Sequence, residues 1–327
     1  MKCEFDDNIF DLQKADFDAL ALEIFRFQYH NNRVYQKFCD SIHTKPGSVK
    51  LVEQIPFLPI SLFKSQKVQC GDFEPALVFE SSGTTQTINS RHYVKNADLY
   101  IKSFTRAFNL YYGDPADYCI LALLPAYLER SNSSLVLMVD QLIQQSNNPM
   151  GGFFLYDHEN LFNRLKQLEA GGQKTLLIGV TFALLDFAEK YQLPLKHSIL
   201  METGGMKGRR EELTREEVHQ QLKRSFSLDT IHSEYGMTEL LSQAYSKGNG
   251  IFNCPPWMKI LLREEDDPLS ITSYNSRGVI NVIDLANIYS CSFIATDDAG
   301  KLYPDGSFEI LGRIDHSDIR GCRLLAL

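Results

Sequence analysis

Residues 81–86 read Ser81-Ser82-Gly83-Thr84-Thr85-Gln86 and follow the short apolar run Ala76-Leu77-Val78-Phe79. Side chains this small and polar cannot build a core, but they can form a tight loop whose backbone N–H groups and hydroxyls converge on an anion. A glycine in such a loop lets the backbone approach the anion closely. Clusters of Ser, Thr and Gly also occur in ordinary hairpin turns. The stretch therefore predicts either a phosphate-binding loop after a strand or a simple turn.

Four further segments give this loop its context. They are Glu202-Thr203-Gly204-Gly205, Glu234-Tyr235-Gly236-Met237-Thr238-Glu239, Thr296-Asp297-Asp298 and Gly312-Arg313-Ile314-Asp315. Together with residues 81–86 they resemble the ATP-binding motifs of the adenylate-forming superfamily, which includes acyl-CoA synthetases, peptide-synthetase adenylation domains and luciferases. The resemblance implies that the chain uses ATP and Mg²⁺ to convert a small carboxylic acid into an acyl adenylate.

The resemblance also implies a role for each motif. Residues 81–85 would cradle the β- and γ-phosphates of ATP, Thr238 would lie near the α-phosphate, and Glu239 would bind Mg²⁺, a cation that prefers oxygen ligands. Tyr235 would stack on adenine, and Arg313 would help to hold the ribose and phosphate. The nucleotide-binding residues implied in this way are Ser81, Ser82, Gly83, Thr84, Thr85, Gly204, Gly205, Glu234, Tyr235, Gly236, Met237, Asp298 and Arg313.

The acid that binds the ribose hydroxyls is assigned by spacing within the resemblance. Asp298 lies six residues before Pro304, the offset that the superfamily keeps between its Thr-Gly-Asp motif and a Pro-Asp-Gly turn. A carboxylate accepts hydrogen bonds through both oxygens and can take two hydroxyl protons. Asp297 stands where the superfamily has glycine. The lysine that usually follows the phosphate loop is missing, and Arg91 is the residue that could substitute for it.

Each motif also has an ordinary interpretation. Thr238 could cap a helix whose first turn contains Glu239. The Gly204–Gly205 pair could be a plain strand-to-helix turn, Asp298 a solvated turn residue and Arg313 half of an exposed ion pair. His92, His197 and His232 lie near motifs, and we interpret them as structural histidines.

The remaining sequence predicts an α/β fold with a largely parallel sheet. Residues 9–42 have apolar side chains at helical spacing. Strand-like runs then alternate with helical patterns, and Thr214 and Glu217 form a capping box that begins one of the helices. After residue 251 the pattern becomes short strands and turns. The expected strands are Leu77–Phe79, Cys119–Leu124, Thr175–Val180, Ser198–Met201, Asp229–His232, Trp257–Leu262, Gly278–Ile283, Cys291–Ala295 and Ser307–Leu311.

These patterns and the resemblance together predict the domain organisation. Residues 1–250 would form an α/β adenylation core with N-terminal helices, and residues 251–327 a β-rich subdomain and tail of the same domain. This is the large N-terminal domain of an adenylate-forming enzyme, with mixed, largely parallel sheets. The small C-terminal domain that supplies a catalytic lysine in most superfamily ligases would be lacking.

Composition indicates which kinds of partner and which cellular compartment to expect. The net charge of −8 over 327 residues argues against nucleic-acid binding, which needs a basic surface. We expect no membrane span, because the longest apolar stretch, residues 175–185, is far too short. The seven cysteines include no Cys-x-x-Cys pair and the N-terminus is acidic, which favours a cytoplasmic protein with reduced thiols.

The C-terminal segment carries the second informative feature, Arg320-Gly321-Cys322-Arg323. Flanking arginines lower the pKa of a thiol and raise its reactivity. An Arg-Gly-Cys sequence near the end of a short chain resembles the LuxE-type acyl-protein synthetases, which carry an activated fatty acid on such a cysteine to a reductase partner. The resemblance is weakest over the N-terminal helices and implies Thr238, Glu239 and Cys322 as the catalytic residues.

Four functions follow as alternatives. The chain could be an acyl-protein synthetase that transfers a fatty or aryl acid to a thiol. That thiol would be Cys322 or would belong to an acyl-accepting protein or carrier. It could be a CoA or carrier-protein ligase that relies on a separate lysine-bearing subunit. It could also be a non-catalytic nucleotide-binding protein, or an acyltransferase that uses Cys322 without ATP. Acid-dependent release of pyrophosphate distinguishes the first two from the others.

Overall fold

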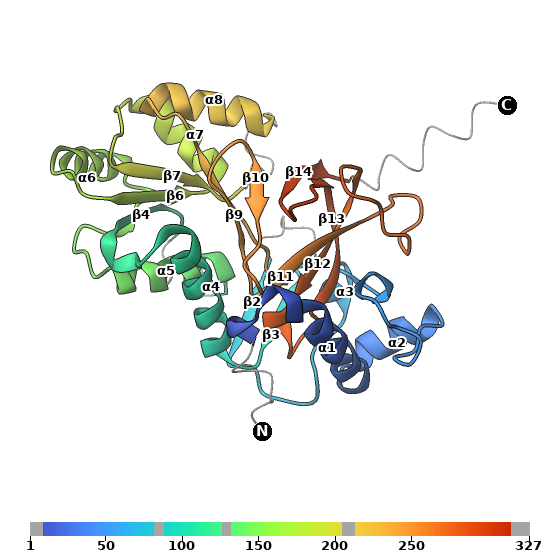
Figure 1. The fold of residues 1–327 in the computed structure, drawn as a ribbon. Coiled ribbons are helices and arrows are strands. Elements are labelled where there is room, and N and C mark those ends of the chain that lie inside the picture. The colour runs from blue at the N-terminus through green and yellow to red at the C-terminus, as the bar shows by residue number, and fades with distance from the viewer. Residues whose placement is uncertain (1–8, 82–87, 126–131, 205–212, 315–327) are drawn as a thin grey trace.

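The computed structural model describes residues 9–81, 88–125, 132–204 and 213–314. Its centre is a mixed sheet of twelve strands with the order β11-β12-β13-β14-β10-β9-β8-β7-β6-β4-β5, and β1 pairs with β13 outside this path. The mixed α/β fold expected from the sequence is confirmed. Figure 1 shows the helices α6, α7 and α8 around one end of the sheet and the N-terminal helices below the other end.

One half of the sheet is parallel and is covered by helices on both faces. Alternate residues of β4 point into two separate cores: Ile120 and Ala122 pack toward α4 and α5, whereas Leu121 and Leu123 pack toward α6, α7 and α8. Strands buried on both faces read as continuous apolar runs, which is why the sequence revealed them. The elements are α4 (Ala97–Tyr112), η4 (Pro115–Asp117), β4 (Cys119–Leu123), α5 (Ser134–Ser146), β5 (Gly152–Phe153), α6 (His158–Ala170), β6 (Thr175–Gly179), α7 (Thr181–Lys190), β7 (Ser198–Glu202), α8 (Arg215–Phe226) and β8 (His232–Tyr235).

The other half of the sheet is antiparallel, as the strand-and-turn pattern after residue 251 indicates. The pairing changes direction at β9, which lies antiparallel to β8. β13 lies between β12 and β14, so the motifs near residues 298 and 313 are carried by neighbouring strands. The elements are β9 (Ala244–Ser246), β10 (Ile251–Asn253), β11 (Met258–Arg263), β12 (Arg277–Asp284), η6 (Leu285–Asn287), β13 (Phe293–Leu302) and β14 (Phe308–Arg313).

Two of the expected strands are formed, with partners or bounds that the sequence did not show. Leu77–Phe79 belongs to β2 (Leu77–Glu80), which pairs only with β3 (Arg91–Val94) in a separate two-stranded sheet. The strand expected at Asp229–His232 is β8, which begins at His232 and continues to Tyr235. The polar side chains of Ser233 and Glu234 conceal this strand in the sequence, because an apolar run is the usual sign of a central strand.

The N-terminal region is helical but is not one helix. Asn32 interrupts it: its side chain accepts a hydrogen bond from the backbone N–H of Tyr35 (3.0 Å), which begins α2, and donates one to the carbonyl of Ser290 (2.9 Å). The buried side chain of Gln28 also bonds to the segment around Asn287, so α1 holds η6 in place. The elements are η1 (Ile9–Asp11), η2 (Lys14–Asp16), α1 (Phe17–Asn31), α2 (Arg33–Ser41), η3 (Val52–Gln54), β1 (Leu58–Pro59) and α3 (Leu62–Ser65).

Candidate nucleotide and reaction site

Three motifs that are far apart in the sequence meet at one place. Tyr235 at the end of β8 donates a hydrogen bond from its hydroxyl to Asp298 Oδ2 on β13, at 2.8 Å. Asp298 Oδ1 lies 3.6 Å from Nε of Arg313 on β14, and the two residues are direct partners in the strand register. The Tyr235 ring is nearly buried between Phe252 and Phe308. The ring, the carboxylate and the exposed guanidinium therefore lie together in one cluster.

The two neighbouring aspartates occupy different environments. Asp298 points to Tyr235, and its backbone N–H donates to Thr296 Oγ1 at 3.1 Å. Asp297 is near the buried guanidinium of Arg263, whose pKa is lowered by burial and raised by this carboxylate. Alternation along β13 explains the difference, because successive side chains point to opposite faces. The assignment of Asp298 as the ribose-binding acid stays a prediction, but Asp298 is the residue that joins the cluster.

Thr238 and Glu239 lie in a turn within residues 236–242, which we call the reaction loop. The helix that Thr238 could have capped is not formed. His92 Nδ1 on β3 lies 2.8 Å from the carbonyl oxygen of Thr238, and His92 Nε2 lies 3.0 Å from Asn287 Oδ1. Asn287 in turn donates from Nδ2 to the carbonyl of Glu239 at 2.7 Å. His92 thus connects β3, the strand that follows the predicted phosphate loop, to the reaction loop.

A buried carboxylate holds the far end of the reaction loop. Asp284 accepts hydrogen bonds from the backbone N–H groups of Leu241 (2.7 Å) and Ser242 (3.0 Å) and from the Ser242 hydroxyl (2.6 Å). Burial raises the pKa of Asp284 to about 6, and these hydrogen bonds oppose the rise. The Asp284 carboxylate has no solvent exposure, so its hydrogen bonds to the loop do not compete with water.

The Glu239 side chain is buried at the same place. Burial raises the pKa of its carboxyl group, while Ser90 and the charges of Arg313 and Lys64 act in the opposite direction. Among the described residues no group of three or more His, Cys, Asp or Glu side chains could hold a metal ion. A single carboxylate still fits Mg²⁺, which is commonly bound by one or two carboxylates together with substrate phosphates and water.

Glu202 organises the turn at the end of β7. Its Oε2 accepts hydrogen bonds from the N–H of Gly204 (2.7 Å) and from Thr181 Oγ1 (3.1 Å). Its Oε1 lies 3.7 Å from Arg215 Nε and 3.6 Å from His219 Nε2. Burial opposes ionisation, but His219, Arg215 and the Gly204 N–H lower the pKa of Glu202 to about 2. Gly204 has a φ of +72°, a left-handed conformation that favours glycine.

Arg215 extends this arrangement to the antiparallel half of the sheet. Its NH1 group donates to the carbonyl of Ile310 on β14 at 2.9 Å. The turn at Gly204 and the strand that carries Arg313 are therefore tied to the same guanidinium.

Some predicted residues are placed elsewhere or lie outside the described residues. Glu234 precedes Tyr235 on β8, so it points to the opposite face of the strand. Arg91 forms an ion pair with Glu80 across the β2–β3 hairpin (3.1 Å). At the open end of that hairpin, the Ser90 N–H donates to the Ser81 hydroxyl (3.0 Å) and the Ser81 N–H donates to the Ser90 carbonyl (3.1 Å). The predicted residues outside the described ranges are Ser82, Gly83, Thr84, Thr85, Gly205 and Cys322.

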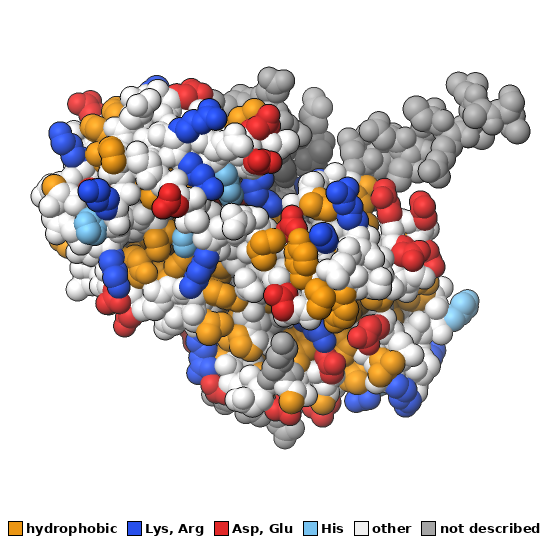
Figure 2. All heavy atoms as spheres, turned by 45° about the horizontal axis from the view of Figure 1, so that its top comes forward, with side chains coloured by type: hydrophobic (Ala, Val, Ile, Leu, Met, Phe, Trp, Pro, Cys, Tyr) orange, Lys and Arg blue, Asp and Glu red, His pale blue; other side chains and the backbone are white. Residues whose placement is uncertain are grey.

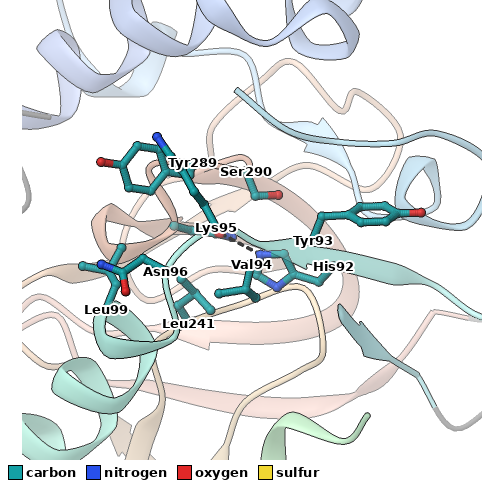
Figure 3. A pocket seen from close by; sticks show the side chains of 10 residues that line it. His92, Tyr93, Val94, Lys95, Asn96, Leu99, Leu241, Tyr289 and Ser290 are labelled. Carbon is teal, nitrogen blue, oxygen red and sulfur yellow. Dashed lines mark hydrogen bonds between the residues drawn. The ribbon is translucent and has the colours of Figure 1, made fainter. Parts of the chain in front are cut away.

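A small pocket lies behind the reaction loop. Figure 3 shows His92, Val94, Leu241 and Tyr289 around it, with a dashed line for a hydrogen bond among the residues drawn. Only about 10 Å³ of the pocket is open to the centre of a water molecule, which is room for roughly one water. The pocket borders the positioning residues and is too small to be the nucleotide site.

Comparison with known proteins identifies the family. The model of the family described as "Acyl-protein synthetase, LuxE" matches residues 5–326. The chain belongs to the LuxE acyl-protein synthetases. A curated relative, the long-chain-fatty-acid–luciferin-component ligase of Vibrio harveyi, is 24% identical over 95% of this chain and 87% of its own length.

Solved structures show that the fold of this LuxE family member is that of adenylate-forming enzymes. An open conformation of 2-hydroxyisobutyryl-CoA ligase, in complex with 2-HIB-AMP and CoA, has a TM-score of 0.68, 13% identity and coverage of 94% of this chain and 77% of its own. ATP-bound MatB from Rhodopseudomonas palustris has a TM-score of 0.55, 16% identity and 74% coverage of this chain. The chain spans about half of the MatB structure, 49% of its length.

Sequence reasoning missed the residues that position the motifs. Glu202 was quoted only as part of a glycine turn, and His92 was interpreted as structural. Asp284 and Asn287 had no signal, since isolated polar residues at the end of a strand are common. The buried state of these side chains was the missing information, because buried polar groups almost always have a specific partner.

Proposed function

We propose that this protein activates a carboxylic acid with ATP and transfers the acyl group to a thiol. In the first step a carboxylate oxygen attacks the α-phosphorus of ATP. The bond from that phosphorus to the bridging oxygen breaks, so that pyrophosphate leaves and an acyl adenylate remains. In the second step a thiolate sulfur attacks the acyl carbon, a thioester forms and AMP leaves with the oxygen.

The observation that carries the proposal is the convergence of Tyr235, Asp298 and Arg313, at 2.8 and 3.6 Å, in a chain of the LuxE family. The cluster offers an aromatic ring, a carboxylate and a cation within one site. These are the groups that a nucleoside phosphate requires: stacking for the base, acceptors for the ribose hydroxyls and positive charge for the phosphates. Arg313 is exposed, as in an ordinary ion pair, but such a pair does not account for the buried Tyr235 that donates to the same carboxylate.

The proposed catalytic roles belong mainly to the reaction loop and the phosphate loop. Thr238 would position the α-phosphate, and residues 81–85 would hold the β- and γ-phosphates. Glu239 would bind Mg²⁺, which would neutralise charge on the phosphates. His92 and Asn287 fix the two carbonyls at Thr238 and Glu239, so the loop is already ordered before the substrates arrive. Most of the rate enhancement would come from positioning and charge stabilisation.

The acyl acceptor is proposed to be Cys322. Four of the described cysteines are poor alternatives, because burial raises the pKa of Cys39 to about 12 and of Cys119 to about 11, and also raises that of Cys254 and Cys291. A thiol with a raised pKa supplies little thiolate at pH 7. Cys322 has arginine on both sides in the sequence, within Arg320-Gly321-Cys322-Arg323.

For the substrate and the cellular compartment we propose only a class of acid and a location. The name of the Vibrio harveyi relative favours a fatty acid, and an acyl-accepting protein or carrier would follow as partner. No helix of the described residues is long and apolar enough to cross a membrane. Figure 2 shows basic and acidic side chains interspersed on the visible face. We propose that the protein acts in the cytoplasm.

Labelling of the protein by a radioactive acid tests the acceptor. With ATP present, wild type should acquire a label that hydroxylamine releases, as it would from a thioester. Cys322→Ser should lose this label and keep pyrophosphate exchange, and Cys39→Ser serves as the control that keeps both. Persistent labelling of Cys322→Ser, or acylation of added CoA by an unlabelled wild type, would favour the CoA or carrier-protein ligase instead.

A further inference from the structure

Three polar groups that have no hydrogen-bond partner among the described residues lie together on β8, on β9 and at the residue just before β9. Glu234 is opposite Tyr245 in the strand register. The Tyr245 hydroxyl and Gln243 Oε1 are buried and have no hydrogen-bond partner, although these side chains are only 1% and 4% exposed. No hydrogen bond reaches the Glu234 carboxyl group from any described residue. We call Glu234, Gln243 and Tyr245 the Glu234 cluster.

The Glu234 cluster is directly behind the reaction loop. A side-chain carbon at Gly236 would clash with the Glu234 carboxyl group and would lie 3.2 Å from Gln243 Cγ. A side chain at position 236 would therefore displace the Glu234 carboxyl group, and Gly236 lets the loop pass close to the cluster. Tyr235 points away, to the face with Asp298, so the strand separates the predicted nucleotide side from the Glu234 side.

Glu234 is partly exposed, and the ionised form of its carboxyl group is disfavoured there. Burial and the nearby charge of Glu202 raise the pKa of Glu234 to about 8. The neighbouring tyrosines do not relieve it, because the Tyr100 hydroxyl donates to the Ser134 carbonyl (2.9 Å) and the Tyr112 hydroxyl pairs with His232 Nδ1 (3.2 Å). The Tyr245 hydroxyl and Gln243 Oε1, which are buried, unpartnered and next to the reaction loop, are groups that a bound ligand would satisfy.

We propose that the Glu234 cluster binds a hydroxyl or amino group on the chain or ring of the acid substrate. The carboxyl of Glu234 and the amide oxygen of Gln243 accept hydrogen bonds, and the Tyr245 hydroxyl can donate or accept. This inference rests on the proposed function, because it assigns the substituent of the acid that the reaction loop activates. The substrate would then be a fatty or aryl acid with a polar substituent, because an unsubstituted chain or ring at this place would leave all three groups unpaired.

Matched acids in the ATP–pyrophosphate exchange assay test the proposal. The pairs are hexanoic acid against its terminal hydroxy and amino derivatives, and benzoic acid against its para-hydroxy and para-amino derivatives. In at least one series we expect the substituted acid to have a kcat/KM at least about 100-fold higher. The hydroxy and amino members of each series show which donor the cluster prefers.

Tyr245→Phe is the informative variant, because it removes a hydroxyl that has no partner and should leave the melting temperature unchanged or higher. It is expected to raise the KM for the preferred acid roughly threefold to tenfold and to leave the KM for ATP unchanged. Tyr35→Phe is the control: it removes a buried hydroxyl that is bonded to the Pro56 carbonyl (2.6 Å), so it should lower stability and leave the acid preference intact.

Two failures are distinguishable. If the plain acids exchange as well as the substituted ones, and Tyr245→Phe has wild-type kinetics, the Glu234 cluster does not bind the substrate and this inference is wrong while the proposed function stands. If no acid of either series supports exchange in wild type, and a wider panel of carboxylic acids gives none, the proposed function itself fails and the inference fails with it.

Discussion

The ion cluster at Glu202 gives a stability effect whose size can be worked out from the structure. The pKa of Glu202 falls from an ordinary value of 4.5 to about 2 in the folded protein, despite burial, because His219, Arg215 and the Gly204 N–H favour the charged form. At about 1.36 kcal/mol for each pKa unit, this difference stabilises the folded state by about 3 kcal/mol at neutral pH.

The sign of the pH dependence follows from the lowered pKa. The contribution is fully present above pH 4.5 and is lost as the pH falls toward 2, because the unfolded chain then binds the proton more tightly. By about pH 3.5 the loss should be about 1.4 kcal/mol. Glu202→Gln removes the charge and leaves Arg215 without its buried partner, so it should lower the free energy of unfolding at pH 7 by about 3 kcal/mol.

Urea unfolding of wild type and Glu202→Gln between pH 3.5 and 7 is the assay. The difference in the free energy of unfolding between the two proteins should become smaller as the pH falls, since only wild type loses the Glu202 contribution. Glu53→Gln, which changes an exposed glutamate, controls for the general effect of removing one negative charge. Equal stability of Glu202→Gln and wild type at pH 7, or a gap that does not change with pH, would refute the reasoning.

The other predictions concern the reaction site. Asp298→Ala should weaken ATP binding by about 1.5–3 kcal/mol in calorimetry, whereas Asp297→Ala should change it little; the reverse order would mean that the assignment is off by one residue. Glu239→Gln should lower the pyrophosphate-exchange rate on the order of 100-fold and raise the Mg²⁺ concentration needed, and an unchanged Mg²⁺ dependence would exclude it as a ligand. His92→Leu should lower the exchange kcat roughly tenfold through the loss of the bond to Thr238; His92→Gln should recover part of that rate because its amide still donates, and equal rates for the two variants would contradict a positioning role.

The parallel half of the fold was predictable because its strands are buried on both faces. β4, β6 and β7 appear as apolar runs, and the capping box at Thr214 marks the start of α8. The separate β2–β3 hairpin was not predictable, because a four-residue apolar strand looks the same in a hairpin and in a larger sheet. Strand partners depend on contacts that a local pattern does not contain.

The site was predictable only where a motif has fixed spacing. The six-residue offset to Pro304 selected Asp298 over Asp297, and the structure brings Asp298 to Tyr235 and Arg313. The spacing could not show that Glu234 faces away from Tyr235, because β8 was expected to end at His232. The hydrogen bond between His92 and Asn287 joins residues that are 195 positions apart in the sequence. No local pattern carries such information.

The most direct test of the central claim is the incorporation of labelled pyrophosphate into ATP by the wild-type protein and by Asp298→Ala. We predict that wild type incorporates the label only when a carboxylic acid and Mg²⁺ are both present, and that Asp298→Ala does so with a higher KM for ATP. Transfer of a labelled acyl group to the protein without ATP, together with no exchange for any acid, would contradict an adenylate-forming mechanism and favour an ATP-independent acyltransferase.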